Sequence, residues 1–177
     1  MITTSRRSVL ALALGATLSI SVNAQEDKNK EEWDVLNPPF SLNEVTINTE
    51  QTTWSSLSIS PDGSYMVFDM LGDLYKVGMD GGKATALTAD FGWNIEPAIS
   101  PDGSQIAFIS DRGGISNIWV MDSNGENLRQ VSKEKNNLIH SPKWSPDGNY
   151  LVATKGIMSS RSIPAGEIWM YHINGGD

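Results

Sequence analysis

The chain of 177 residues has the length of one ordinary domain, and its 39% hydrophobic and 19% charged residues are typical of a folded globular protein. A net charge of −8 without a dense basic cluster excludes nucleic acid as a partner, because binding a polyanion requires clustered Lys and Arg. The chain contains no cysteine, which excludes a disulfide framework and a thiolate metal site.

Residues 1–24 are typical of a cleaved export signal. Arg6 and Arg7 precede an apolar run from Val9 to Ile20, and small residues follow where a signal peptidase would cut. The run is shorter than the roughly 20 apolar residues that span a bilayer, so we expect no membrane span after cleavage. The mature chain is therefore expected in the periplasm or outside the cell. The paired arginines also match a twin-arginine signal, and both export routes stay open.

Two short segments lie between the signal and the first repeat. Residues 25–32 contain no apolar side chain and predict a solvated linker. In the N-terminal segment 33–50, the apolar Val45 and Ile47 alternate with polar neighbours up to Thr49. This alternation predicts one extended strand ahead of the repeats.

The tetrapeptide Ser-Pro-Asp-Gly occurs three times, at 60–63, 100–103 and 145–148. A spacing of about forty residues with strand-like content predicts β-propeller blades, one per repeat. We therefore expect an all-β fold, a partial β-propeller of about three four-stranded blades. The repeats cover about 51–88, 89–132 and 133–177.

Each repeat can be divided into strands by its turn residues. Pro-Asp-Gly suits a tight turn, because proline presets φ, aspartate bonds its own backbone and glycine accepts positive φ. The three recurring aspartates are therefore interpreted as turn residues. The first strands are expected to end at Ser60, Ser100 and Ser145; the second strands cover 65–70, 105–110 and 150–155; the third begin at 73, 117 and 167; the fourth carry Leu87-Thr88 and Val131-Ser132.

The third repeat stops at Asp177, before the position where its fourth strand is expected. We therefore predict an incomplete last blade and interpret the chain as the N-terminal part of a longer product. The predicted strand at Val45–Thr49 would pair with the last blade of the full ring and close it. An open ring exposes apolar sheet faces, so poor solubility is also expected.

No catalytic, cofactor or metal site is predicted in this chain. His140, expected in a connection before Pro142, and His172, expected in a third strand, lack the paired spacing of a zinc site. Neither a Gly-x-Ser-x-Gly elbow nor a glycine-rich phosphate loop occurs. The tryptophans at repeat positions are interpreted as blade-packing residues: Trp54, Trp93, Trp119, Trp144 and Trp169.

Four side chains in the loops between second and third strands are candidates for binding a partner: Asp111, Arg112, Arg161 and Glu167. Loops on a rigid scaffold commonly carry binding groups. Local ion pairs that order each loop are the alternative interpretation of the same residues.

The stretches 52–77 (TTWSSLSISPDGSYMVFDMLGDLYKV), 100–125 (SPDGSQIAFISDRGGISNIWVMDSNG) and 161–176 (RSIPAGEIWMYHINGG) resemble TolB-like propellers. The Phe68–Tyr75 and Arg161–Trp169 stretches most strongly resemble the propeller that precedes the catalytic domain of large exported bacterial amidohydrolases. The Ser-Pro-Asp-Gly and Ser-Asp-Arg elements are shared more widely and specify the fold only.

The resemblance implies a non-catalytic propeller module with a binding or gating role, whose partner is a protein, a peptide or a C-terminal domain. In the amidohydrolase group, a divalent metal is expected on His-x-His ligands of a separate barrel, which these 177 residues do not contain. The alternative is a TolB-like periplasmic propeller that acts in protein–protein interaction at the cell envelope. A gated peptidase, which ranks last, would need a Ser-His-Asp domain downstream.

Overall fold

The structure, a computed structural model, describes residues 34–41, 43, 45–157 and 165–175. The predicted signal at 1–24 and the linker at 25–32 lie outside the described residues. Eleven strands and no helix form within them: β1 (Leu57–Ile59), β2 (Tyr65–Met70), β3 (Asp73–Gly78), β4 (Thr85–Ala86), β5 (Asn94–Ile99), β6 (Gln105–Ser110), β7 (Asn117–Asp122), β8 (Arg129–Gln130), β9 (Leu138–Trp144), β10 (Tyr150–Ile157) and β11 (Ala165–His172).

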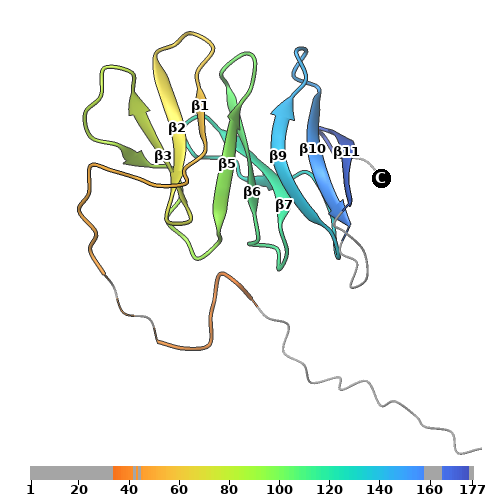
Figure 1. Ribbon diagram of the computed structural model, residues 1–177, viewed down its shortest axis with the longest axis horizontal. Helices are drawn as coiled ribbons and strands as arrows, with labels where there is room; N and C mark the ends of the chain where they lie inside the picture. Colours follow the sequence, from red (N-terminus) through yellow and green to blue (C-terminus); the bar gives the residue numbers. More distant parts are fainter. Residues whose placement is uncertain (1–33, 42, 44, 158–164, 176–177) are drawn as a thin grey trace, which may run out of the picture. The chain divides into compact units, whose positions relative to one another are not determined.

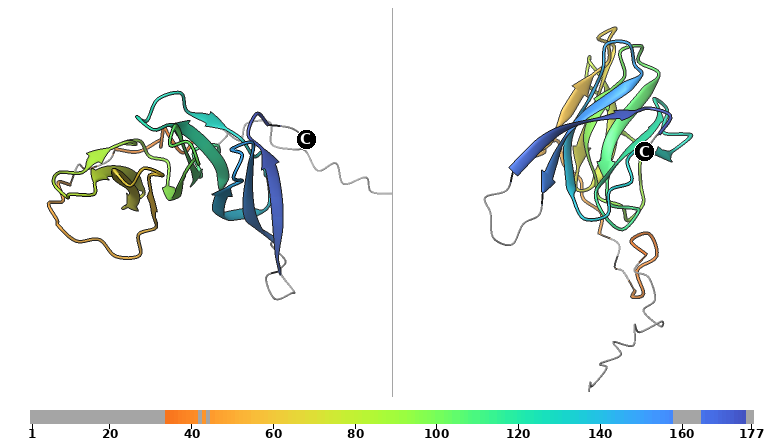
Figure 2. Two further views of the ribbon diagram at one scale, coloured as in Figure 1. Left: turned by 90° about the horizontal axis from the view of Figure 1, so that it is seen from above. Right: turned by 90° about the vertical axis from the view of Figure 1, so that its right-hand side faces the viewer.

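The strands form three antiparallel sheets, one from each repeat. The first two sheets have the orders β1-β2-β3-β4 and β5-β6-β7-β8, and the third has the order β9-β10-β11 within the described residues. The sheets lie side by side in chain order, with the second between the first and the third (Figures 1 and 2). The predicted all-β, partial propeller architecture is confirmed.

The Ser-Pro-Asp-Gly elements form the turns between the first and second strands of each sheet. In the second sheet, Asp102 Oδ1 accepts the Ser104 amide at 3.0 Å and the Ser100 hydroxyl at 2.6 Å. Gly103 has φ +76°, a left-handed conformation that disfavours a side chain. The hydrogen bonds from Ser100 and Ser104 hold the pKa of Asp102 at about 2. The interpretation of these aspartates as turn residues is confirmed.

The fourth strands differ from the prediction, because β4 and β8 end just before the aliphatic–hydroxyl pairs. After β4, Leu87 N donates to Leu74 O at 2.8 Å, which continues the pairing with β3. The Thr88 hydroxyl then accepts Leu74 N at 2.9 Å and donates to Asp73 at 2.8 Å. A side-chain hydroxyl thus replaces the backbone as partner of the third strand. We call this arrangement the hydroxyl bridge.

The same bridge forms in the second sheet. Ser132 Oγ accepts Ile118 N at 2.8 Å and donates to Asn117 at 2.8 Å. The hydroxyl is buried in both sheets, at Thr88 and Ser132. Because buried backbone amides are costly when unpaired, the bridge stabilises the start of each third strand.

Two apolar cores fill the spaces between the sheets. The first lies between the first and second sheets and contains Val67, Leu74, Ile106, Phe108 and Met121. The second lies between the second and third sheets and contains Ala98, Ala107, Ile109, Ile118, Val120, Val131, Ile139, Leu151, Ala153 and Ile173. The second sheet therefore packs on both faces, as its apolar strands predict. Burial of each large side chain contributes roughly 1.5–3 kcal/mol.

Two sequence predictions about local structure are not met. The described residues at 45–49 form no strand, and Val45 and Ile47 are 75% and 59% exposed. A strand needs a partner edge, and this segment has none within the part of the chain that the structure describes. Its role in closing a ring stays a prediction.

The position predicted for His140 is wrong, because this residue lies within β9 and not in the connection before it. The strand bends at Ser141, whose φ is +54°, where its register with β10 shifts. Such a bulge lets β9 continue past the histidine and through Pro142. His172 lies at the end of β11, as predicted.

Candidate functional site

The loops at one end of the first two sheets are joined by hydrogen bonds. Asn94 N, at the start of β5, donates to Gly72 O in the turn between β2 and β3 at 2.8 Å. Trp93 N donates to Asp111 Oδ1 at 2.7 Å, which connects the loop after β6. We call this end, formed by residues 71–72, 88–93 and 111–116, the loop face.

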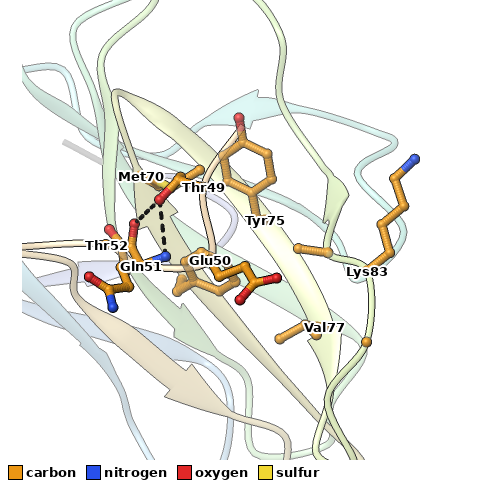
Figure 3. Close-up of a pocket in the computed structure, with 11 residues that line it drawn as sticks. Thr49, Glu50, Gln51, Thr52, Met70, Tyr75, Val77 and Lys83 are labelled. Carbon is orange, nitrogen blue, oxygen red and sulfur yellow. Dashed lines mark hydrogen bonds between the residues drawn. The ribbon is translucent and has the colours of Figure 1, made fainter. Parts of the chain in front are cut away.

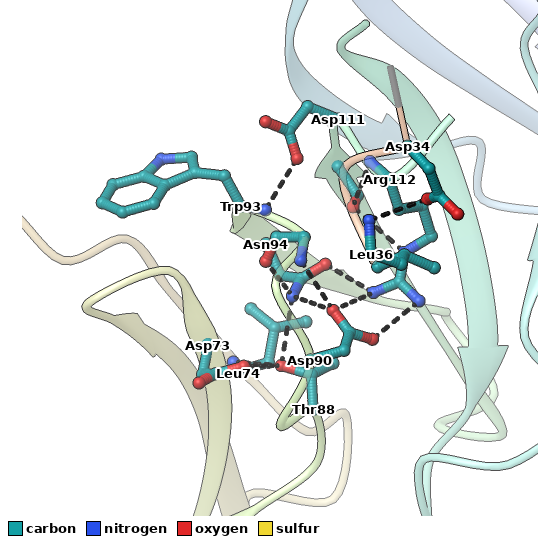
Figure 4. A network of polar contacts seen from close by, with 12 residues as sticks. Asp34, Leu36, Asp73, Leu74, Thr88, Asp90, Trp93, Asn94, Asp111 and Arg112 are labelled. Atoms are coloured by element: carbon teal, nitrogen blue, oxygen red, sulfur yellow. Dashed lines mark hydrogen bonds and ion pairs between the residues drawn. The ribbon is translucent and has the colours of Figure 1, made fainter. Parts of the chain in front are cut away.

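Arg112 is the centre of a polar network beneath the loop face (Figure 4). Its Nη1 atom lies 3.1 Å from Asp90 Oδ2, and its side chain is only 4% exposed. Nη2 donates to Asn94 Oδ1 at 2.6 Å, and Nε donates to the Ser110 hydroxyl at 3.1 Å. The guanidinium also lies 5.3 Å from the centre of the Trp119 ring, within cation–π range. The cation is thus fully engaged by its own chain.

A second ion pair joins the second and third sheets. Lys155 Nζ lies 2.9 Å from Glu134 Oε2, and 3.7 Å from the centre of the Trp169 ring. Burial opposes ionisation of Glu134, but hydrogen bonds from Asn137 and Lys155 outweigh it and lower the pKa of Glu134. Burial and the Glu134 charge raise the pKa of Tyr171, whose hydroxyl donates to that carboxylate at 3.2 Å.

These two ion pairs are built in a similar way in successive repeats. In each, an acid from the connection between sheets meets a base of the next sheet, beside the aromatic residue of its third strand. The bases differ in position, because Lys155 lies within β10 and Arg112 lies two residues after the end of β6. We call each pair an acid–base clamp: Asp90 with Arg112, and Glu134 with Lys155. Sequence reasoning missed the two acids and Lys155. The available signal was the acid that stands two residues after each buried hydroxyl, at Asp90 and Glu134.

The four predicted loop residues have different surroundings. Arg112 is buried, so it contributes to the scaffold, and its acidic partner is Asp90 rather than the neighbouring Asp111. Asp111 accepts the Trp93 amide at 2.7 Å. Glu167 is exposed and accepts Trp169 Nε1 at 2.8 Å. Arg161 lies outside the described residues, so the structure brings no four-residue site together.

Three large apolar side chains on the loop face are exposed: Leu71 (64%), Phe91 (57%) and Trp93 (55%). The Trp93 side chain points away from the Arg112 network (Figure 4). Its ring lies against Gly72, where an added Cβ would come within 2.7 Å of ring atom Cε3. Trp54 is fully exposed. The prediction that all five repeat tryptophans pack between blades is therefore wrong for Trp54 and Trp93. Trp169 is also exposed, at 42%, and belongs to neither apolar core.

A groove of about 740 Å³ lies on the outer face of the first sheet, away from the second (Figure 3). Its floor consists of apolar and aromatic side chains from β2 and β3. Residues 49–52 cross over it and form one wall. The floor residues are Phe68, Met70, Tyr75 and Val77.

Within the described residues, no group of three or more His, Asp or Glu side chains is placed to hold a metal ion. No helix that could cross a membrane occurs in residues 34–41, 43, 45–157 and 165–175.

The sequence family model for the TolB beta propeller domain matches residues 43–170, most of the chain. The chain belongs to the TolB β-propeller family. The match begins ahead of β1 and ends within β11, so it includes residues of all three sheets.

Similar proteins agree with this assignment to the TolB propellers. A TolB homologue from Chlorobaculum tepidum is 34% identical over 82 residues, which make up 46% of this chain and 18% of that protein. A TolB-like structure from Agrobacterium tumefaciens has a TM-score of 0.63 at 26% identity and covers 72% of this chain and 48% of that one. TolB from Acinetobacter baumannii has a TM-score of 0.56 at 26% identity, and the match covers 70% of this chain and 31% of that one. The chain thus spans less than half of each relative.

Proposed function

We propose that the chain is a non-catalytic propeller module that binds a protein or peptide partner through its loop face. The supporting observation is a difference between the charged and the apolar side chains of that face. The charged Asp90 and Arg112 form an ion pair with each other, whereas the apolar Leu71, Phe91 and Trp93 are exposed. Exposed aromatic and aliphatic side chains on a rigid scaffold are typical of protein-binding surfaces.

We propose further that this module belongs to the N-terminal part of an exported, metal-dependent amidohydrolase, where it binds or gates access to the catalytic domain. Support comes from the Phe68–Tyr75 stretch and the stretch ending at Trp169, which resemble that group in particular. The described residues do not fit the divalent metal of such an enzyme, because no group of three possible ligands occurs among them. The metal would belong to the separate barrel.

The second candidate is a periplasmic TolB-like propeller that acts in protein–protein interaction at the cell envelope. The similarity to TolB proteins along all three sheets favours it. Both candidates require export by the signal at residues 1–24, and both use the loop face for a partner. They differ in what the partner is: a barrel of the same product or a separate envelope protein.

The coding region after Asp177 distinguishes the two candidates. A frame that completes the propeller and enters a barrel with His-x-His supports the amidohydrolase. A stop after a completed propeller supports the envelope interaction protein and removes the amidohydrolase proposal.

Site-specific crosslinking tests the loop face itself. A photoreactive phenylalanine analogue at Trp93 should give one discrete adduct in the producing bacterium. The matched control carries the analogue at Lys83, which is also exposed but lies in the turn after β3. Equal adducts at both positions, or none at Trp93, would argue against a loop-face partner. Zinc-dependent hydrolysis by the purified chain would contradict the non-catalytic assignment.

A further inference from the structure

Two largely buried basic side chains of this chain are each held by a carboxylate and a tryptophan. Arg112 lies 3.1 Å from the Asp90 carboxylate, and its guanidinium carbon lies 5.3 Å from the centre of the Trp119 ring. The carboxylate supplies the opposite charge, and the face of the indole ring attracts a cation through its quadrupole. The same three kinds of group recur between the second and third sheets: Lys155 with Glu134 and Trp169.

A third carboxylate and a third tryptophan lie next to each other on the loop face. The Asp111 carboxylate accepts the backbone amide of Trp93 at 2.7 Å, which keeps it beside the residue that carries the indole (Figure 4). Trp93 is 55% exposed. Asp111 forms no ion pair within the part of the chain that the structure describes. This surface pair therefore has the acid and the aromatic ring of the two internal sites, but it has no base.

The base that follows Asp111 in the sequence is already engaged elsewhere. The side chain of Arg112 turns beneath the loop face, where it is 4% exposed and pairs with Asp90. It also donates to the side-chain oxygen of Asn94 at 2.6 Å and to the Ser110 hydroxyl at 3.1 Å. Arg112 is therefore not available to neutralise Asp111 at the surface.

The backbone and the ring of Trp93 are held in place before any partner binds. The ring lies against Gly72, where an added Cβ would come within 2.7 Å of ring atom Cε3. Gly72 has φ +88°, a left-handed conformation that also favours glycine. The amide of the next residue, Asn94, donates to Gly72 O at 2.8 Å. A ring that is already positioned loses little conformational freedom when a ligand contacts it, which favours binding.

The charge of the surrounding loops favours a basic partner. Segments 71–73, 88–93 and 111–116 contain three aspartates, and their single basic residue is the buried arginine. Because Arg112 is paired with Asp90, these segments contain no base that balances Asp73 and Asp111. The chain as a whole carries a net charge of −8. Complementary charge of this kind speeds the encounter with a basic partner and disfavours an acidic one.

We propose that Trp93 and Asp111 bind a lysine or arginine side chain of the partner, which takes the place that a base occupies in the internal sites. The cationic group lies over the indole ring and pairs with the Asp111 carboxylate. The exposed Leu71 and Phe91 contact apolar residues beside it. The partner is therefore a basic segment of a protein or peptide with apolar neighbours. This inference rests on the proposed function of the loop face and adds the chemistry of the side chain that the face recognises.

Matched peptides test which side chain is recognised. The probe is a fluorescein-labelled peptide, Gly-Leu-Arg-Leu-Gly, and its control carries citrulline in place of arginine, which keeps nearly the same shape and removes the charge. An exposed cation–π contact and an exposed ion pair together predict about three- to thirtyfold tighter binding of the arginine peptide. Fluorescence anisotropy measures both affinities. Equal affinity for the two peptides, including no measurable binding of either, would overturn the proposal.

Variants of the chain assign the preference for arginine to the two residues. Asp111→Asn keeps an oxygen that can accept the Trp93 amide but removes the charge, and Trp93→Leu keeps an apolar side chain but removes the ring. Each should reduce the preference for the arginine peptide by about two- to fivefold. The matched control Asp80→Asn, in the exposed turn after β3, should leave the preference unchanged. An equal effect of Asp80→Asn would mean that the peptide responds only to the overall negative charge, and would overturn the proposal.

A crosslink at Phe91 separates this inference from the proposed function. A photoreactive phenylalanine analogue at this position leaves Trp93 and Asp111 in place, and it should give an adduct in the producing bacterium that Asp111→Asn weakens. An undiminished adduct with Asp111→Asn would overturn the basic side chain but leave the loop-face partner intact. The absence of an adduct at both Phe91 and Trp93 would instead count against the loop-face partner itself.

Discussion

The carboxylate of Asp90 lies 3.1 Å from the Arg112 guanidinium and joins the connection after the first sheet to the loop after β6 in the second. Arg112 is 4% exposed and Asp90 is 36% exposed, so the pair is shielded on the arginine side. The arginine depends on this single acid for charge compensation among the contacts described for it. The clamp is therefore a structural element of the propeller.

Asp90→Ala should destabilise the fold by about 3 kcal/mol, because it leaves the buried Arg112 cation without its acid. Chemical denaturation monitored by tryptophan fluorescence measures the change. Combining Asp90→Ala with Arg112→Met should recover part of the loss, since the unpaired charge is then removed. Asp80→Ala, in an exposed turn, is the matched control and should change stability little. An equal effect of both acid substitutions would contradict the clamp.

Thr88→Val should cost about 1–3 kcal/mol, although the two side chains have nearly the same shape. Valine cannot accept the Leu74 amide, which is buried and bonded to the Thr88 hydroxyl at 2.9 Å. Thr85→Val, on the exposed β4, is the matched control and should be near neutral. Thermal unfolding monitored by circular dichroism compares the stabilities of the two variants. If both variants unfold alike, the hydroxyl bridge does not stabilise the strand.

Asp73→Asn should stabilise the chain at neutral pH by up to about 1 kcal/mol. Burial raises the pKa of Asp73, against the effect of its hydrogen bond from Thr88. A raised carboxyl pKa means that the ionised form is disfavoured in the fold, so the gain should be present at pH 7 and vanish below about pH 4. Denaturation midpoints at several pH values provide the measurement.

In the second sheet, the opposite substitution, from asparagine to aspartate, can be tested. Asn117 occupies the equivalent position, is 1% exposed, and donates to Glu134 O at 3.1 Å. Asn117→Asp removes that donor and buries a charge, so it should destabilise the fold. If Asp73→Asn instead destabilises the fold, the ionised carboxylate of Asp73 stabilises the first sheet, and the prediction is wrong.

Asp102→Asn should be less stable than the natural chain at pH 5, by less than about 1 kcal/mol because the turn is exposed. Hydrogen bonds from Ser100 and Ser104 lower the pKa of Asp102 to about 2, below its unfolded value of about 3.9. The stabilisation is therefore present above about pH 4 and is lost as the pH falls through 2. The difference in denaturation midpoint should disappear towards pH 2, and a constant difference would contradict the assignment.

The strand order was predictable because several local requirements coincide in every repeat. Each Ser-Pro-Asp-Gly marks a turn by backbone chemistry alone, and the apolar strands before and after it can form only one hairpin. The position of His140 was not predictable in the same way. The bulge at Ser141 depends on pairing with β10, which lies later in the chain.

The orientation of the candidate side chains was less predictable than the strands. Arg112 lies in a loop of the kind that carries binding groups, yet its partner Asp90 lies 22 residues earlier. Only the packing of one sheet on the next brings them together. Trp93 occupies a repeat position typical of packing, but the Gly72 turn supports its ring at the surface.

The second sheet has neighbours on both sides, whereas the first and third each have one within the described residues. In a row of this kind, each sheet derives part of its stability from the adjacent ones. Amide hydrogen exchange should therefore be slowest in β6 and β7, which open only when a flanking sheet detaches. A ligand that holds either outer sheet in place would slow exchange at the centre without touching it, so the middle sheet can report binding at a distance.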